Sequence, residues 1–299
     1  MERGRHSRGM RKSMKTIESE LPFNYKTIRI TQSRIDKGLL AIPVSIIDYF
    51  PKDKTKVYIA VGTGEPLPKK FTPYTSTSRE CRIGGMRSFY EKFAVKDGDE
   101  VVLQLLDTNS YRIFTEQQFG CLIRKAEGNF DEATSETEAE ENLGNISKIA
   151  NTKPEETLWS EFYRLSKVEV GKRRHKILKL GKIKEGVSPS TRKLLTEIYK
   201  GKCQISGFGF LMKNSKPYFE IHHVEPVLGD HLKNVLVVSP NVHAQFTYAV
   251  VEEYFDGDGW LRRVKFNDQE FVVNHIIDKI PKRFEKEIHY EHERRNPLG

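Results

Sequence analysis

In the N-terminal part of the chain, apolar and polar positions follow an order that is typical of short β-strands. Alternating or β-branched runs predict strands at residues 25–31, 56–61, 100–106 and 111–115. Two short helices are predicted between them, at residues 46–50 and at residues 86–93, where aromatic side chains recur at helical spacing. Because strands and helices do not alternate regularly, we expect an α+β protein that begins with an antiparallel, barrel-like domain.

The C-terminal part of the chain has a different pattern. Its apolar runs predict a helix at residues 191–199 and strands at residues 218–221 and 235–238. Ser239 and Pro240 predict the start of another helix, running to about residue 253, because Ser is a strong N-cap and Pro is favoured at the first helical position. Residues 254–264 predict a hairpin, since their Asp-Gly turn lacks the ligand spacing of a calcium loop.

Residues 126–157 interrupt these patterns with a strongly acidic stretch. Residues 127–156 contain nine acids and two lysines, with few large apolar side chains. Such a composition buries too little surface to offset the entropy of ordering, so we expect a flexible tether. The expected organisation is a disordered basic arm at residues 1–20, a β-rich domain at 21–125, the tether at 126–157, and a second domain at 158–299.

The charge of the chain favours a polyanionic partner. The formal net charge is +9, so the chain outside the acidic stretch carries about +16. Nucleic acid is the first expectation, because no apolar run is long enough to span a membrane. Lys172, Arg173 and Arg174 belong to a dense basic run that either contacts phosphates or is only a solvated surface. Three scattered cysteines fit a reducing cytoplasm rather than a disulfide framework.

Three histidines form the most informative cluster. His222 and His223 are adjacent in a predicted strand, so one can hold a metal while the other faces a substrate. His243 lies in the first turn of the helix that follows, and folding this helix across the hairpin would bring it beside His222. Two imidazoles for one divalent ion leave coordination positions open for water and substrate, as in a catalytic metal site.

The residues around these histidines resemble the HNH endonuclease family, which has a ββα-metal layout. The positions that match in order and spacing are Glu220, His222, His223, Pro226, Gly229, Asn234 and residues 235–243. The resemblance implies that His222 and His243 ligate a divalent metal, with Mg²⁺ expected first and Mn²⁺ or Ni²⁺ as alternatives. It also implies that His223 is the general base for the attacking water and that Asn234 fixes the loop that orients it.

The sequence departs from the family pattern in two places. Cys203 is the one cysteine kept where many members have two CxxC pairs, so a structural zinc is not expected. Some relatives have a third histidine four residues after the helix histidine, where this chain has Thr247. The packing would then depend on aromatic side chains, namely Phe208, Phe210, Phe219, Phe246 and Tyr248. An alternative interpretation is a zinc site without catalysis, made by Cys203 and the histidines, including His231.

The N-terminal pattern resembles the DNA-binding pseudobarrel of plant B-three transcription factors, which is also the specificity module of some restriction endonucleases. The matching order runs through residues 37–43, 57–59, 84–90, 95–99 and the strand from residue 101. The resemblance implies two DNA-gripping arms, at residues 32–37 and 74–80. Their expected DNA contacts are Gln32, Ser33, Arg34, Asp36, Lys37, Thr75, Ser76, Thr77, Ser78 and Arg79. The alternative is a generic small β-barrel with a solvated loop.

Together, these features predict a site-specific DNA endonuclease of the restriction type, acting in the cytoplasm of a bacterial or archaeal cell. Cutting both strands of double-stranded DNA with one active site per chain most simply requires a homodimer. Two alternatives are an endonuclease that depends on base modification and a DNA-binding regulator whose HNH fold has no catalytic activity.

Overall fold

The structure is a computed structural model that describes residues 25–74, 80–168 and 187–280. Three of the expected features lie outside the described residues. They are the basic arm at residues 1–20, most of the second arm that the resemblance assigns to DNA (Thr75, Ser76, Thr77, Ser78 and Arg79), and the basic run Lys172, Arg173 and Arg174. The chain is of the α+β class and divides into two compact units, with the boundary between Leu122 and Ile123. No helix among the described residues is long and apolar enough to cross a membrane.

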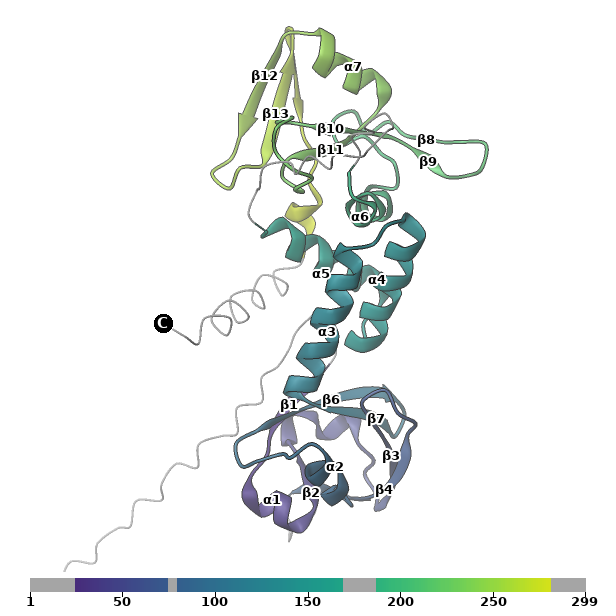
Figure 1. Ribbon diagram of the computed structural model, residues 1–299, viewed down its shortest axis with the longest axis vertical. Helices are drawn as coiled ribbons and strands as arrows, with labels where there is room; N and C mark the ends of the chain where they lie inside the picture. The colour runs from purple at the N-terminus through teal and green to yellow at the C-terminus, as the bar shows by residue number, and fades with distance from the viewer. Residues whose placement is uncertain (1–24, 75–79, 169–186, 281–299) are drawn as a thin grey trace, which may run out of the picture. The chain divides into compact units, whose positions relative to one another are not determined.

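The N-terminal unit is built on a barrel-like sheet, seven-stranded over the described residues, with the order β1-β6-β7-β3-β4-β5-β2 (Figure 1). Its strands are β1 (Lys26–Arg29), β2 (Leu39–Ile42), β3 (Thr55–Val61), β4 (Leu67–Thr72), β5 (Cys81–Gly84), β6 (Glu100–Asp107) and β7 (Ser110–Thr115). The four predicted strands are confirmed as β1, β3, β6 and β7. The sheet is not purely antiparallel, however, because β3 and β7 pair in parallel.

Short helices occupy the breaks between these strands. They are α1 (Gln32–Lys37), the 3₁₀ helix η1 (Val44–Tyr49) and α2 (Arg87–Lys92). The last two confirm the predicted helices. The helix α1 coincides with the expected arm at residues 32–37, so this arm is helical rather than an extended loop. It ends at Gly38, whose φ of 59° is a conformation that favours glycine.

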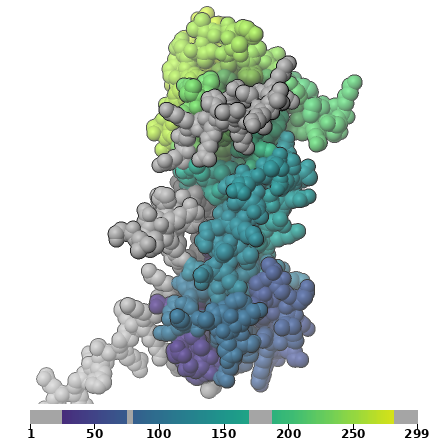
Figure 2. Space-filling view, viewed as in Figure 1, coloured from purple at the N-terminus to yellow at the C-terminus, as the bar shows by residue number. Residues whose placement is uncertain are grey.

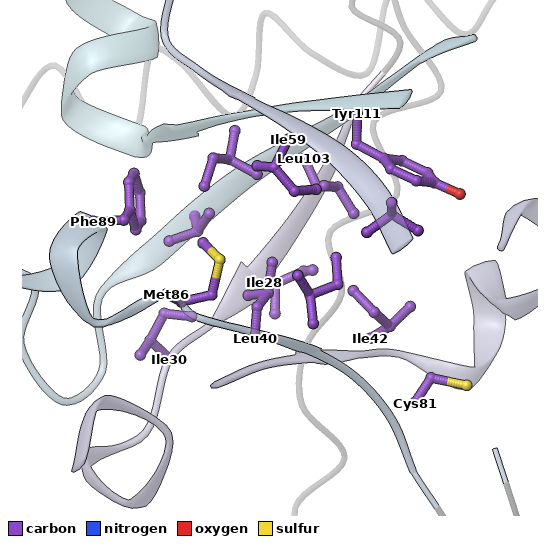
Figure 3. Packing of buried hydrophobic residues seen from close by; sticks show 14 of the residues in the cluster. Ile28, Ile30, Leu40, Ile42, Ile59, Cys81, Met86, Phe89, Leu103 and Tyr111 are labelled. Carbon is purple, nitrogen blue, oxygen red and sulfur yellow. The ribbon is translucent and has the colours of Figure 1, made fainter. Parts of the chain in front are cut away.

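Apolar side chains from the inner face of the curved sheet fill the interior of the N-terminal unit. Ile28, Leu40 and Ile59 converge with Met86 from the turn before α2 (Figure 3). The phenol of Tyr111 is buried among them, and its hydroxyl donates a hydrogen bond to the Tyr49 carbonyl at 2.5 Å. The alternating strands therefore fold because one face of each has this core to cover.

The expected flexible tether at residues 126–157 is wrong. This stretch folds into the end of α3 (Glu116–Asp131), all of α4 (Glu136–Ala150) and the start of α5 (Pro154–Ser166). Ala139, Leu143, Ile146 and Ala150 recur at helical spacing along α4 and are buried, while its glutamates face solvent. Ser135 caps the helix by accepting a hydrogen bond from the Glu138 amide. A narrow apolar stripe was enough to bury one face, although the average composition is acidic.

The C-terminal unit packs this helical layer against small sheets. Its further elements are α6 (Pro189–Tyr199), β8 (Phe210–Leu211), β9 (Pro217–Tyr218), β10 (Glu220–His223), β11 (Val235–Val238), α7 (Pro240–Tyr248), β12 (Val251–Phe255), β13 (Leu261–Phe266), β14 (Gln269–Val272) and the 3₁₀ helix η2 (Ile276–Lys279). The predicted hairpin at residues 254–264 is confirmed by the pairing of β12 with β13. The helix after Ser239 ends at Tyr248 rather than near residue 253, because a β-prone run starting at Val250 continues as β12.

The aromatic packing expected in this unit is only partly correct. Phe219 is buried and Phe246 is half-buried. Phe208, Phe210 and Tyr248 are instead exposed, with 56%, 45% and 87% of their surface accessible. The core uses the aliphatic side chains of β11 in their place. Val235 and Val237 enter one cluster and Leu236 and Val238 the other, so β11 is buried on both faces.

Candidate functional site

The candidate site is a β-hairpin followed by a short helix. β10 and β11 are antiparallel, with His222 opposite Leu236 and His223 opposite Val235. The buried strand β11 anchors the hairpin, since both of its faces lie in apolar clusters. The helix α7 starts directly after β11, where the Ser239 hydroxyl caps the Val242 amide and Pro240 occupies the first position. The chain therefore forms a ββα unit at the place where the histidines occur.

His222 and His243 lie side by side on β10 and α7. Their ring centroids are 5.6 Å apart, and the ring planes are inclined by 70°. The His222 ring also stacks on Phe246, with centroids 3.8 Å apart. Burial, and then the neighbouring His243 and His223, lower the pKa of His222 to about 4. His222 is therefore neutral at pH 7, which is the form that can donate a nitrogen lone pair to a metal.

A carboxylate orients the second imidazole. Nδ1 of His243 lies 2.5 Å from Oε2 of Glu220, and the other carboxylate oxygen accepts a hydrogen bond from the Tyr218 hydroxyl at 3.1 Å. Because a carboxylate can only accept, Nδ1 of His243 carries a proton, and Nε2 is the nitrogen left to bind a metal. A histidine fixed in this way by a carboxylate is the usual arrangement behind a metal ligand.

The adjacent histidine has a different carboxylate partner. Nε2 of His223 lies 3.0 Å from Oδ1 of Asp230, and Oδ2 of Asp230 accepts a hydrogen bond from the Ser188 amide at 3.0 Å. His222 and His223 thus contact different elements, α7 and the loop after β10, as expected for neighbours in a strand. Asp230 was not among the residues predicted from the sequence, although its position directly after Gly229 in the hairpin loop was an available signal.

Asn234 ties the loop between β10 and β11 together. Its buried side chain accepts a hydrogen bond from the Glu225 amide at 2.8 Å and donates to the carbonyls of Glu225 and Gly229, each at 3.0 Å. The loop that presents Asp230 to His223 is therefore closed by one amide group. An unpaired buried amide would be costly, so these three hydrogen bonds strongly favour this loop conformation.

The donor set suits a divalent metal, but among the described residues only two imidazoles converge. Within residues 25–74, 80–168 and 187–280, no group of three or more His, Cys, Asp or Glu side chains is arranged to hold an ion. Thr247 does not complete such a group, because its hydroxyl donates to the backbone carbonyl of His243 at 3.3 Å. His222 and His243 can supply two nitrogens to a metal whose remaining positions are open to water and substrate.

The first expected DNA-gripping arm lies on α1 in the N-terminal unit. Gln32, Ser33, Asp36 and Lys37 are exposed there. Gln32 donates a hydrogen bond to Asp36 at 2.8 Å. Arg34 is half-buried and forms an ion pair with Glu80 at 2.5 Å, so it is held by the protein itself.

Comparisons with known proteins give little beyond these observations. No protein-family model matches the sequence, and no curated protein matches it. Among solved structures, a FUS3–DNA complex from Arabidopsis shares 17% identity over 30% of this chain and 92% of that chain, with a TM-score of 0.26. A hypothetical Arabidopsis thaliana protein shares 14% identity over 30% of this chain and 87% of that chain, with a TM-score of 0.26. The N-terminal domain of Helicobacter pylori LlaJI.R1 shares 12% identity over 30% of this chain and 78% of that chain, with a TM-score of 0.25.

Proposed function

We propose that this chain is a metal-dependent DNA endonuclease whose C-terminal unit contains an HNH catalytic centre. The observation that supports this most is the ββα unit itself, in which His222 and His243 lie side by side and His223 faces the other way toward Asp230. Each histidine has the environment that its role needs. His222 is neutral, His243 is oriented by Glu220, and His223 is hydrogen-bonded to a second carboxylate.

In this proposal the bound metal would be held by His222 and His243 and would supply positive charge for the scissile phosphate. His223 takes a proton from the attacking water. Since Nε2 of His223 faces Asp230, Nδ1 is the nitrogen that accepts it, and Asp230 then stabilises the resulting imidazolium. Asn234 keeps the loop closed so that this pair stays aligned.

The N-terminal unit would select the DNA sequence. Its barrel-like sheet with short helices fits the pseudobarrel expected of B-three domains, and α1 offers exposed Gln32, Ser33 and Lys37 as groups for base edges or phosphates. The positive charge of the chain outside the acidic stretch favours the same polyanionic substrate. By likeness to the family, the products would be 5′-phosphate and 3′-hydroxyl ends, and a homodimer would cut both strands.

The test is digestion of a mixed-sequence DNA with Mg²⁺, Mn²⁺ or Ni²⁺, followed by sequencing of the ends. Wild-type protein should cut at a defined site, while His223→Ala should lose at least about 100-fold in rate and retain DNA binding. Thr247→Ala is the matched control and should keep the wild-type rate, because Thr247 is an exposed residue on α7, the helix that also carries His243. Methylated and unmethylated substrates, run side by side, separate the modification-dependent alternative.

The second candidate function is a DNA-binding regulator with an inactive HNH fold. The observation in its favour is that only two imidazoles converge among the described residues. If wild type binds DNA at a defined site but never cuts with any of the three metals, the regulator is the better description.

A further inference from the structure

The β8–β9 hairpin is the part of the C-terminal unit whose composition the nuclease site does not explain. Residues 206–216 are all exposed, and they include the apolar side chains of Phe208, Phe210, Leu211 and Met212. Leu211 has 65% of its surface accessible. Figure 2 shows this hairpin, in green, standing out from the surface of its unit. Exposing a cluster of large apolar side chains is costly unless something covers it.

The hairpin is a well-defined projection rather than a loose loop. Its tip is a three-residue turn, in which the Ser215 amide donates to the Met212 carbonyl at 2.9 Å and Ser215 adopts a φ of 61°. The Met212 amide donates to the Lys216 carbonyl at 2.8 Å. At the base, the Phe210 ring stacks on Tyr218 with centroids 5.2 Å apart. These contacts hold the hairpin in one conformation, in which Leu211 and Met212 are exposed next to its tip.

The charge on the hairpin identifies the class of partner. Residues 200–218 contain four lysines, Lys200, Lys202, Lys213 and Lys216, and no acid. Lys213 and Lys216 flank the apolar tip and are exposed. Apolar side chains framed by cations match DNA, whose phosphates flank a stack of apolar base faces.

The hairpin is also directly connected to the candidate catalytic centre. Tyr218 of β9 stacks on Phe210 and donates its hydroxyl to Glu220, which in turn holds His243. Leu211 lies opposite Pro217, and from Pro217 to His222 the chain advances by five residues of nearly continuous strand, or at most about 17 Å. Duplex DNA held at the histidines and running along this strand would therefore reach Leu211 within about five base-pair steps, at about 3.4 Å a step.

We propose that the β8–β9 hairpin is a DNA-distorting wedge, in which Leu211 and Met212 enter the groove and unstack a base step while Lys213 and Lys216 hold the flanking phosphates. This inference rests on the proposed function for its substrate, because it places the wedge beside the DNA that the nuclease cuts. Side chains inserted in this way open a base step at some cost and gain contacts with the bent duplex.

The test compares two 30-base-pair duplexes of one mixed sequence, fully paired or with a central two-base mismatch, in buffer with EDTA so that no cleavage occurs. A wedge favours DNA that is already unstacked, so wild type should bind the mismatched duplex about 5- to 10-fold more tightly. Leu211→Ser and Met212→Ser should remove that preference. Val272→Ser is the matched control, because Val272 is as exposed on β14, at 63% of its surface.

The wedge proposal is overturned if wild type binds both duplexes equally, or if the Leu211 and Met212 variants keep the preference. It is also overturned if these variants change only the sedimentation of the free protein, which would make the hairpin a self-association surface. Failure of the proposed endonuclease is a separate result, since it would appear as intact DNA in the metal-containing digests while the binding preference in EDTA persists.

Discussion

At the scale of single residues, the candidate site depends on three pairs of side chains, and in each an acid or an aromatic ring constrains a histidine. His222 stacks on Phe246, His223 contacts Asp230, and His243 contacts Glu220. The two carboxylates differ in what they would do. Glu220 lies behind an expected metal ligand, whereas Asp230 lies behind the expected general base, so replacing them should affect different steps.

Replacing Asp230 with Asn should mainly slow the chemical step. An amide can still meet Nε2 of His223, but it cannot stabilise the imidazolium or hold the same tautomer, so we expect kcat to fall about 10- to 100-fold with KM nearly unchanged. Rates measured under saturating metal and DNA would show this split. Asp258→Asn, on the exposed turn after β12, is the control. A parallel rise in KM would instead mean that Asp230 only supports the loop.

His275 should make the C-terminal unit less stable in acid. Burial lowers its pKa from the ordinary 6.5, although the Leu261 carbonyl and the acids Asp278 and Asp256 oppose the effect and Arg262 adds to it. Below about pH 6.5 the unfolded chain therefore takes up a proton that the folded chain resists, so the free energy of unfolding falls as the pH falls. The neutral side chain of His275→Gln should remove this part of the slope.

Urea unfolding between pH 5 and pH 7 would measure this slope. Both tryptophans of the chain, Trp159 and Trp260, lie in the C-terminal unit, and the Trp260 ring is 4.9 Å from that of His275, so fluorescence reports on this unit. The variant will be less stable at every pH because it loses packing. The prediction concerns the slope alone, and equal slopes in the two proteins would contradict it.

At the scale of elements, the helix α4 shows where composition misleads. Its glutamate-rich composition predicts a tether, yet Ala139, Leu143, Ile146 and Ala150 are buried at regular helical spacing. The N-cap Ser135 and this apolar stripe are both present in the sequence. The average composition of the whole segment does not reveal them, because it counts residues without regard to their spacing. The strands of the barrel-like sheet were easier to predict because their pattern fills most of each segment.

The parts of the candidate site that depend on local sequence signals were predictable, and the contacts between distant residues were not. Ser239, Pro240 and the adjacent histidines are local signals, and the ββα unit follows them. Asp230 could not be paired with His223 from the sequence, because their contact depends on how Asn234 folds the loop. The exposure of Phe208 and Phe210 was not predictable either, since an aromatic residue in a short strand is usually buried.

Truncating Ile146 should distinguish a packed helix from a tether. The side chain is only 2% exposed, so Ile146→Ala should lower the free energy of unfolding by about 2 to 4 kcal/mol. Glu141→Ala, on the exposed face of the same helix, should change it by less than about 0.5 kcal/mol. Urea midpoints of the two variants measure the difference. Equal stabilities would return residues 126–157 to the description of a flexible linker.

A histidine placed one turn after His243 should strengthen metal binding. Residues four apart share a helix face, so Thr247→His would add a third imidazole beside His222 and His243. Isothermal titration with Ni²⁺ or Mn²⁺ should show at least about 10-fold tighter binding, because imidazole suits these ions better than it suits Mg²⁺. Gln245→His is the control, since its position two residues on points elsewhere. No gain for Thr247→His would argue against a metal between His222 and His243.

At the scale of the whole molecule, one proposed catalytic centre per chain must serve a duplex with two antiparallel strands. A symmetric homodimer solves this, since its two-fold axis can coincide with that of a palindromic DNA site. Each protomer would then cut one strand, with its N-terminal unit reading half of the sequence. This model makes the strand cuts separable, because each would depend on the His223 of a single protomer.

Mixing wild type with an excess of His223→Ala tests this arrangement on a supercoiled plasmid. Most active dimers would then contain one working centre, so nicked circles should accumulate at the expense of linear DNA. The same excess of Thr247→Ala, which keeps its general base, should leave the ratio of nicked to linear product unchanged. A monomer that cuts each strand in turn would instead show a slower overall rate with the wild-type product ratio, and analytical ultracentrifugation on cognate DNA would then find a single chain.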